Sequence, residues 1–161
     1  MALPRRHSIK RTRLEDASIE NGLSFSWTNA TYDYDAADTI LLVKNTSTTH
    51  NLHIDQIWCH GDTTTTVTVF WANSVTPAGT SVTGVNLNTT SSNVAEATAK
   101  GDDTGNSGGS NVWVGSIPAD NATPVLISSG LILASGYSVG VDYTTDGGEA
   151  LVTIIGHYEN A

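Results

Sequence analysis

The alternation of hydrophobic and polar positions is clearest over residues 51–73. In the first half of this stretch, one face of an extended chain carries Leu52, Ile54 and Trp58, and the other carries His53, Asp55, Ile57 and Cys59. After a short polar turn at residues 61–63, Val67 and Val69 alternate with threonines. A period of two, with β-branched and aromatic residues on both sides of a short turn, predicts a β-hairpin.

Similar short segments recur along the chain. Alternating or apolar runs cover residues 23–28, 39–44, 81–88, 111–117, 125–127, 131–133, 137–143 and 151–158. The sequence Asp-Gly-Gly at residues 146–148 predicts a second hairpin between the last two runs. Helical patterns are limited to a turn or two before Gly22 and a short segment at residues 93–99. The pattern predicts an all-β fold, an antiparallel β-sandwich that is jelly-roll-like, although a barrel also fits it.

Length and composition divide the chain into two parts. A chain of 161 residues suits one domain with a core of useful size. We expect a basic N-terminal arm at residues 1–22 and a β-sandwich at residues 23–161, with a long Gly/Asp-rich surface loop near residues 89–110. Long loops in compact domains are often functional or are ordered by a partner.

Positive charge is concentrated in the arm. Five of the seven basic residues are Arg5, Arg6, Lys10, Arg11 and Arg13. The first thirteen residues carry a charge of +5, whereas residues 14–161 contain two lysines and sixteen acids and carry a charge of −14. This asymmetry predicts a basic arm with an acidic or phosphate-bearing partner; a solvated tail is the alternative. The acidic body argues against broad nucleic-acid binding by the domain itself, and the sequence leaves open whether the arm contacts protein or nucleic acid.

The single cysteine and the lack of long apolar runs narrow the setting. Cys59 has no second cysteine to pair with, which fits a reducing compartment. The N-terminus shows no apolar signal-peptide core, and no run approaches the ~20 apolar residues needed to span a bilayer. We therefore expect no secretory signal and no membrane partner.

One motif resembles a hydrolase signature. Residues 136–140 read Gly-Tyr-Ser-Val-Gly, which matches G-x-S-x-G. In a hydrolase this motif needs a strand, a sharp turn and then a helix that exposes the serine. Ser138 instead falls within an alternating strand, so we expect a structural serine and no catalytic residue.

Several residues have the chemistry of metal or sugar binding. His50, His53, Asp55 and His60 lie within eleven residues, and His53 and Asp55 share a strand face from which they could reach one metal ion. A third and a fourth ligand are missing nearby, and solvent-facing polar residues explain the same pattern. Glu149 and Glu159 are too isolated to suggest a catalytic pair. We therefore predict no metal and no cofactor.

The remaining candidates are aspartates and tryptophans. Asp33, Asp35 and Asp38, and separately Asp102 and Asp103, have oxygen ligands suited to calcium but lack the spacing of an EF-hand, so solvated loops are expected. Trp27, Trp58, Trp71 and Trp113 could form a sugar-stacking platform, although core packing is the simpler interpretation.

Three stretches together resemble a known class of proteins. They are residues 39–46 (Thr-Ile-Leu-Leu-Val-Lys-Asn-Thr) with residues 51–54, residues 93–97 with the loop that follows, and residues 136–143 with residues 153–159. They resemble small β-sandwich structural proteins of tailed-bacteriophage virions, which decorate or cement capsids or form tail and fibre parts. The resemblance covers roughly residues 38–159 and excludes the arm.

The resemblance implies a non-enzymatic role and a location in the virion, after assembly in the host cytoplasm. It implies the major capsid protein or another virion protein as partner, and a homo-oligomer, with a trimer favoured. We therefore predict a capsid decoration protein; a tail or fibre component with a carbohydrate- or receptor-binding role is the alternative. Exposed sheet edges would be covered by such self-association.

Overall fold

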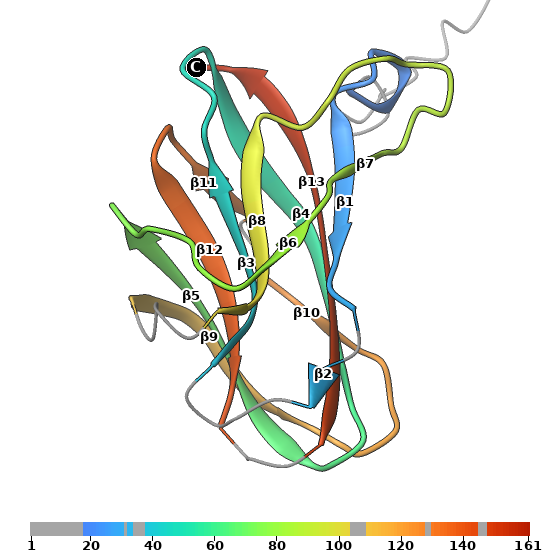
Figure 1. Ribbon diagram of the computed structural model, residues 1–161, viewed down its shortest axis with the longest axis vertical. Helices are drawn as coiled ribbons and strands as arrows, with labels where there is room; N and C mark the ends of the chain where they lie inside the picture. Colours follow the sequence, from blue (N-terminus) through green and yellow to red (C-terminus); the bar gives the residue numbers. More distant parts are fainter. Residues whose placement is uncertain (1–17, 31, 34–37, 104–108, 128–129, 145–147) are drawn as a thin grey trace, which may run out of the picture.

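A computed structural model describes residues 18–161 except residues 31, 34–37, 104–108, 128–129 and 145–147. The described residues form two antiparallel sheets that pack face to face (Figure 1). Their strands are β1 (Ser24–Thr28), β2 (Tyr32–Asp33), β3 (Thr39–Asn45), β4 (His50–Gly61), β5 (Thr65–Asn73), β6 (Thr80–Val82), β7 (Val85–Asn86), β8 (Ala97–Asp103), β9 (Ser110–Ile117), β10 (Thr123–Val125), β11 (Leu131–Leu133), β12 (Tyr137–Tyr143) and β13 (Glu149–Asn160). The predicted all-β sandwich is confirmed.

The two sheets have different strand orders. The first, which we call the β4 sheet, has the order β10-β4-β13-β1-β7, with β11 also paired to β4 and β2 to β13. The second, the β12 sheet, has the order β6-β8-β3-β12-β5-β9. Strands that are adjacent in a sheet are mostly far apart in the sequence, so the fold depends on long-range pairing.

The pairing follows the jelly-roll pattern. Four strands from the first half of the chain pair with strands of the second half in reverse order: β1 with β13, β3 with β12, β4 with β10 and β11, and β5 with β9. This is the pairing of one long antiparallel ribbon rolled into two sheets, as in a double-sheet jelly roll. The strands β6, β7 and β8 come from the segment between β5 and β9 and extend the two sheets at their edges.

Both predicted hairpins are wrong. β4 lies in the β4 sheet and β5 in the β12 sheet, so the turn between them crosses from one sheet to the other. The connection from β12 to β13 makes the same kind of crossing. A strand shows the same alternation whether its successor lies beside it or across the core, so the pattern could not separate the two cases. The 12-residue β4 instead finds a full-length partner in the 12-residue β13.

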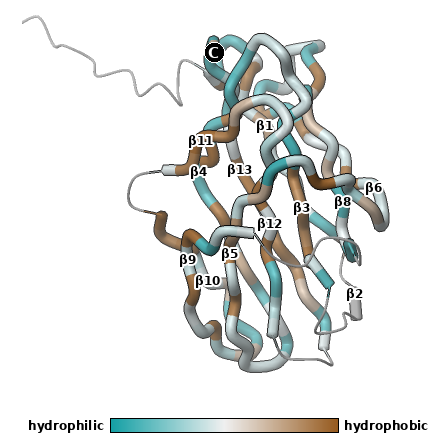
Figure 2. The backbone as a smooth tube through the Cα atoms, turned by 90° about the vertical axis from the view of Figure 1, so that its left-hand side faces the viewer, coloured by the Kyte–Doolittle hydropathy of each residue, from teal (hydrophilic) through white to brown (hydrophobic). Residues whose placement is uncertain are grey.

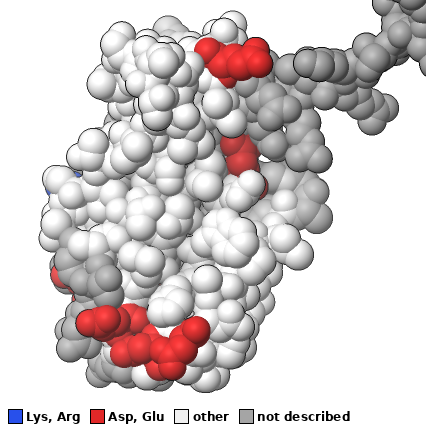
Figure 3. All heavy atoms as spheres, turned by 90° about the vertical axis from the view of Figure 1, so that its right-hand side faces the viewer, with Lys and Arg blue, Asp and Glu red and all other residues white. Residues whose placement is uncertain are grey.

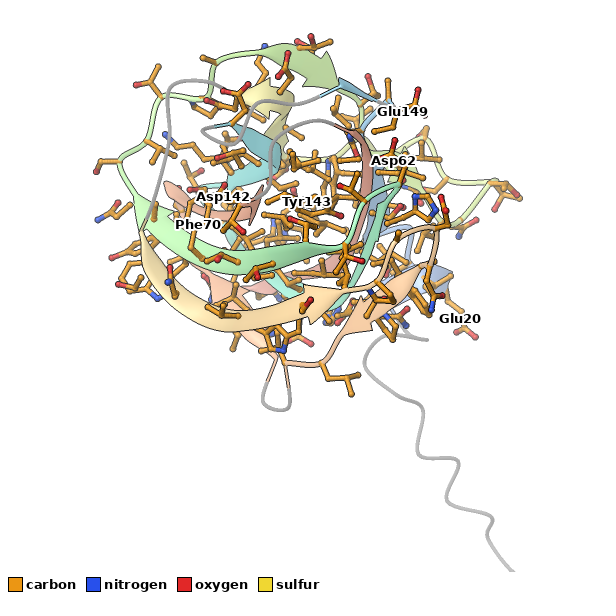
Figure 4. The ribbon with its side chains drawn as sticks, turned by 90° about the horizontal axis from the view of Figure 1, so that it is seen from below. Glu20, Asp62, Phe70, Asp142, Tyr143 and Glu149 are labelled. Atoms are coloured by element: carbon orange, nitrogen blue, oxygen red, sulfur yellow. The ribbon has the colours of Figure 1, made fainter. Side chains whose placement is uncertain are left out.

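The core lies between the sheets. β3 carries an unbroken hydrophobic run, visible as brown in Figure 2, and all four side chains of that run are buried. Among the described residues, Trp27 and Tyr143 are the largest side chains with no solvent exposure. Tyr143 lies in the interior of the sandwich (Figure 4). Its hydroxyl donates a hydrogen bond to the His60 carbonyl 3.0 Å away and so joins the two sheets. A smaller buried group of Leu42, Phe70 and Ala72 lies apart from this main core.

The described part of the arm is one helical turn at residues 18–20. Gly22, with a φ of 68°, ends it, and the Leu23 amide donates to the Ser18 carbonyl. Asn88 and Asn93 donate side-chain hydrogen bonds to the carbonyls of Glu20 and Asn21. This turn and the C-terminus lie at the same end of the sandwich (Figure 1).

The segment at residues 93–103 differs from the expectation. Residues 97–103, expected in a short helix and then a surface loop, form β8 and pair with β3. Lysine and threonine side chains hide this strand from a hydrophobicity pattern, because only Ala99, Gly101 and Asp103 of it are buried. No helix in the described part of the chain is long and apolar enough to span a lipid bilayer.

Candidate functional site

The candidate site lies on the outer face of the β4 sheet, where a bulge interrupts the pairing of β4 with β13. Gln56 pairs with Ile155 and Ile54 with Gly156, which leaves Asp55 as an extra residue. Bulges bend a strand and re-aim its side chains, and they are frequent next to functional sites. The extra residue also shifts the alternation of β4, so the inward-facing positions change from even to odd.

The predicted faces of β4 are therefore wrong beyond the bulge. Leu52 and Ile54, predicted to share one face, are both buried, but Ile57 and Cys59, predicted on the other face, are buried with them. Trp58, predicted to share the face of Leu52 and Ile54, is 40% exposed on the opposite side of the strand. Asp55, which has no partner on β13, explains this exchange of faces. The sequence of β4 alone does not reveal the bulge.

Four side chains meet beside the bulge; we call His53, Asp55, His157 and Glu159 the imidazole–carboxylate cluster. His53 and His157 are direct cross-strand partners, and their rings stack with centroids 5.0 Å apart and planes at 23°. The Asp55 carboxylate oxygens lie 2.9 and 2.8 Å from His157 Nδ1. The Glu159 carboxylate lies 3.2 Å from His157 Nε2 and 3.5 Å from His53 Nε2.

The electrostatics of the cluster centre on His157, which is only 4% exposed. An ionised carboxylate only accepts hydrogen bonds, so Nδ1–H of His157 donates to Asp55. The hydrogen bond to Asp55 holds the pKa of His157 above its usual range; burial opposes this, and Glu159 adds to the rise. The arrangement fixes the orientation of the His157 ring and directs Nε2 toward Glu159.

A groove of about 440 Å³ adjoins the cluster and shares Asp55 with it. Its other walls come from β4 and from residues 124–127. The Trp58 indole N–H donates a hydrogen bond to Gln56 Oε1 3.2 Å away, which orients the exposed ring. Leu126 in the groove wall is 79% exposed, and Ile132, the cross-strand partner of His53, is 59% exposed. Exposed apolar side chains thus flank the polar cluster.

The histidines singled out in the sequence are divided among three places. His53 and Asp55 share a face, as predicted, and each of them contacts His157. Glu159 is the fourth member of the cluster. His50 is at the start of β4, hydrogen-bonded to Thr49 and 3.5 Å from Glu96. His60 pairs with Leu151 at the far end of the same strand. Neither belongs to the cluster.

Sequence reasoning missed His157 and set Glu159 aside as isolated. Both lie on β13, about a hundred residues from β4. The sequence does carry a signal: on each strand an acidic residue follows a histidine two positions later, Asp55 after His53 and Glu159 after His157. It becomes informative only when β4 and β13 are known to be neighbours.

The G-x-S-x-G segment forms the middle of β12. Ser138 is fully buried, and its hydroxyl donates to the Ala72 carbonyl 3.1 Å away. Gly140 lies against the Phe70 ring, where a Cβ atom would come within 2.2 Å of Cζ. The predicted strand position of Ser138 is confirmed, and both residues have structural roles.

Burial and hydrogen bonds place several of the remaining candidate residues. Asp103 is buried and accepts a hydrogen bond from the Ala78 amide at 2.8 Å. Of the four tryptophans, Trp27 lies in the core as predicted, whereas Trp58 faces solvent. Asp35 and the five arm residues, Arg5, Arg6, Lys10, Arg11 and Arg13, lie outside the described residues.

Comparison of the chain with protein-family models, with curated proteins and with solved structures gives no match.

Proposed function

We propose that this chain is a non-enzymatic structural protein of a virus particle, a capsid decoration protein that binds the phage shell and neighbouring copies of itself. In this proposal the jelly roll is a rigid block, and the basic arm and the outer face of the β4 sheet attach it. The resemblance of residues 38–159 to such proteins gives the setting, and the arrangement of charge gives the mechanism of attachment.

The separation of charge between the arm and the body is the observation that carries the proposal. Outside the arm the chain has two basic residues, and both are engaged: Lys44 Nζ donates to the Val75 carbonyl and Lys100 Nζ to Ser81 Oγ. One face of the sandwich shows several acidic groups and almost no lysine or arginine (Figure 3). A basic arm is therefore suited to bind an acidic surface, either on the shell or on the body of a neighbouring copy.

Exposed apolar side chains support a second contact. Trp58, Leu126 and Ile132 stand on or beside the outer face of the β4 sheet. Jelly rolls leave sheet edges that natural proteins cover, and self-association is one way to cover them. A homo-oligomer, with a trimer favoured, fits this requirement, and the major capsid protein or another virion protein is the proposed larger partner.

The groove beside Trp58 favours one alternative, a tail or fibre component that binds a carbohydrate receptor. An exposed indole next to carboxylate and amide groups is suited to stack on a sugar ring while polar groups bind its hydroxyls. Asp55 and Gln56 provide those polar groups at the groove wall. In this alternative the chain is still a virion protein, but the surface that it binds is a host glycan.

Immunogold labelling of purified virions from cells that carry the gene tests the proposal. Antibodies raised against the folded chain are expected to label the whole shell. Label confined to one vertex would overturn the decoration role in favour of a tail component. Virions whose protein content, measured by mass spectrometry, lacks the chain would overturn both.

The glycan alternative has its own test. Tryptophan fluorescence of the chain is followed while glycans from a panel of bacterial surface sugars are added. A saturable change that is lost in Trp58→Ala and kept in Trp71→Ala would support it, and an unmoved spectrum across the panel would contradict it.

A further inference from the structure

We propose that His53, His157 and Glu159 form a binding site for one divalent transition-metal ion of the Zn²⁺ class, with Asp55 orienting His157. This site does not depend on the attachment role proposed above. It uses the three groups of the imidazole–carboxylate cluster that can each offer a ligand atom to a common centre.

The distances fit a metal ion. The ligand atoms of the three residues all lie within 4.8 Å of one another. Zinc bonds of about 2.0–2.1 Å in tetrahedral geometry place neighbouring ligand atoms about 3.3–3.5 Å apart. Glu159 Oε1 is 3.2 Å from His157 Nε2, and the second carboxylate oxygen, Oε2, is 3.5 Å from His53 Nε2. Small side-chain rotations are therefore enough to bring the three ligands around one ion.

Asp55 gives the arrangement its specificity. A histidine that binds a metal usually donates its second ring N–H to a carboxylate, which fixes the tautomer and raises the basicity of the ligand nitrogen. His157 makes this contact with both Asp55 oxygens at 2.9 and 2.8 Å. Its Nε2 is thus directed toward Glu159, the position that a metal ligand requires.

The fold holds the ligands on rigid elements. His53 lies on β4 and the other two ligands on β13, two strands that pair over their full length in the centre of the β4 sheet. The bulge supplies Asp55 at the right place. Sites on strands are held more firmly than sites on loops, so little ordering is needed on binding.

The ligand types select the metal. Two imidazoles and one carboxylate suit Zn²⁺, Co²⁺, Ni²⁺ or Cu²⁺, whereas Ca²⁺ and Mg²⁺ prefer sites made of oxygen ligands. Three protein ligands leave a fourth coordination position for a further ligand. A water molecule is the ligand expected there in the isolated chain.

The competing interpretation is a network of ion pairs in which protonated His157 bridges two carboxylates. Calorimetric titration of the full, tag-free chain with Zn²⁺ separates the two. We expect one Zn²⁺ per chain. Glu159→Gln and His53→Gln should each weaken Zn²⁺ binding by about 100-fold or more, because each removes a ligand and not only a residue that orients one. Matched controls on the same two strands, His60→Gln and Glu149→Gln, should leave the affinity unchanged, and Mg²⁺ should give no heat of binding.

Asp55→Asn tests the positioning role. It should weaken Zn²⁺ binding by about 10- to 100-fold without changing the stoichiometry. With Co²⁺ as the probe, the wild-type chain should show the visible absorption of tetrahedral Co²⁺. Added Zn²⁺ should displace the Co²⁺ and abolish this absorption.

Absence of Zn²⁺ binding at about 100-fold molar excess would overturn the proposal and leave an ion-pair network only. Binding that is equally strong in His53→Gln and Glu159→Gln would also overturn it. Circular dichroism of each variant without metal confirms that the sandwich is folded, so a loss of affinity reports on the ligands.

Discussion

Replacing Gly140 with alanine should destabilise the fold by crowding Phe70. Gly140 lies in the middle of β12, paired with Phe70 on one side and Leu42 on the other. A Cβ atom at this position would lie 2.2, 2.6 and 2.9 Å from three atoms of the Phe70 ring. These distances are too short for carbon atoms, so either the ring or the strand must move.

The cost follows from how firmly Phe70 is held. Its ring is fully buried with Leu42 and Ala72, and Val75 packs against this group. Forcing extra volume into a packed site costs about 1–3 kcal/mol. We expect Gly140→Ala to lower the free energy of unfolding by about 2–3 kcal/mol, the upper end of this range, because the added Cβ clashes with a rigid, buried ring. For a chain of this length each kcal/mol lowers Tm by about 2–4 °C.

Urea unfolding followed by tryptophan fluorescence measures this change. The midpoint should fall while the m-value stays constant, because the surface exposed on unfolding is the same. A double-mutant cycle with Phe70→Leu identifies the cause. The smaller side chain should relieve the clash, so the double variant should be more stable than the sum of the two single changes predicts.

Gly136→Ala is the matched control from the same strand region. Gly136 has a φ of 85°, and no atom lies within 4 Å of the position that a Cβ would take. Its cost of about 1–2 kcal/mol should therefore come from backbone strain alone. It should show no coupling to Phe70→Leu. A Gly140→Ala chain as stable as wild type, or strictly additive effects with Phe70→Leu, would refute the reasoning.

Three further predictions concern buried polar groups. Burial raises the pKa of Asp142 to about 6, and the nearby Asp103 adds to the rise. The Asp142 carboxyl therefore holds its proton more tightly in the folded state than in the unfolded state. As pH rises from about 4 to 6, ionisation of Asp142 lowers the free energy of unfolding. Asp142→Asn should flatten that part of the pH–stability curve and be more stable than wild type at about pH 7.5 by about 1–2 kcal/mol, allowing for partial solvent access; an unchanged slope would contradict this. Asn29→Ala should cost about 2–4 kcal/mol in urea unfolding, because the buried Val152 amide, 2.6 Å from Asn29 Oδ1, loses its acceptor; a loss below ~0.5 kcal/mol would show that water replaces the side chain. Burial raises the pKa of Cys59 to about 12, so the native thiol should not react with a disulfide reagent at about pH 8 until the chain is unfolded with urea; rapid reaction of the native chain would contradict its burial.

The strands were largely predictable from the sequence, and their partners were not. Alternation over residues 51–73 located β4 and β5 well, because period two follows from one buried face. The same alternation fits a hairpin and a crossing between sheets, so the pairing of β4 with β13 needed the three-dimensional structure. β8 escaped detection because its buried positions are Ala99, Gly101 and Asp103, which carry little hydrophobic signal.

The candidate site was half visible in the sequence. The shared face of His53 and Asp55 follows from their spacing, and that part is confirmed. The other half depends on β13, whose register with β4 places His157 opposite His53. The exposure of Trp58 could not be predicted for a related reason: it depends on the bulge at Asp55, which exists only relative to the partner strand.

Attachment to shells tests the central claim, that a rigid β-sandwich is fastened to a larger assembly by its arm, most directly. Shells stripped of this protein are mixed with the full chain, with a folded variant that lacks residues 1–14, and with a control in which Lys44 and Lys100 are replaced by glutamine. Co-sedimentation at moderate salt then measures the bound fraction of each. The account predicts saturable binding of the full chain and of the lysine control, and a large loss for the truncated variant. A full chain that stays in the supernatant, or a truncated variant that binds as tightly as the full chain, would contradict it.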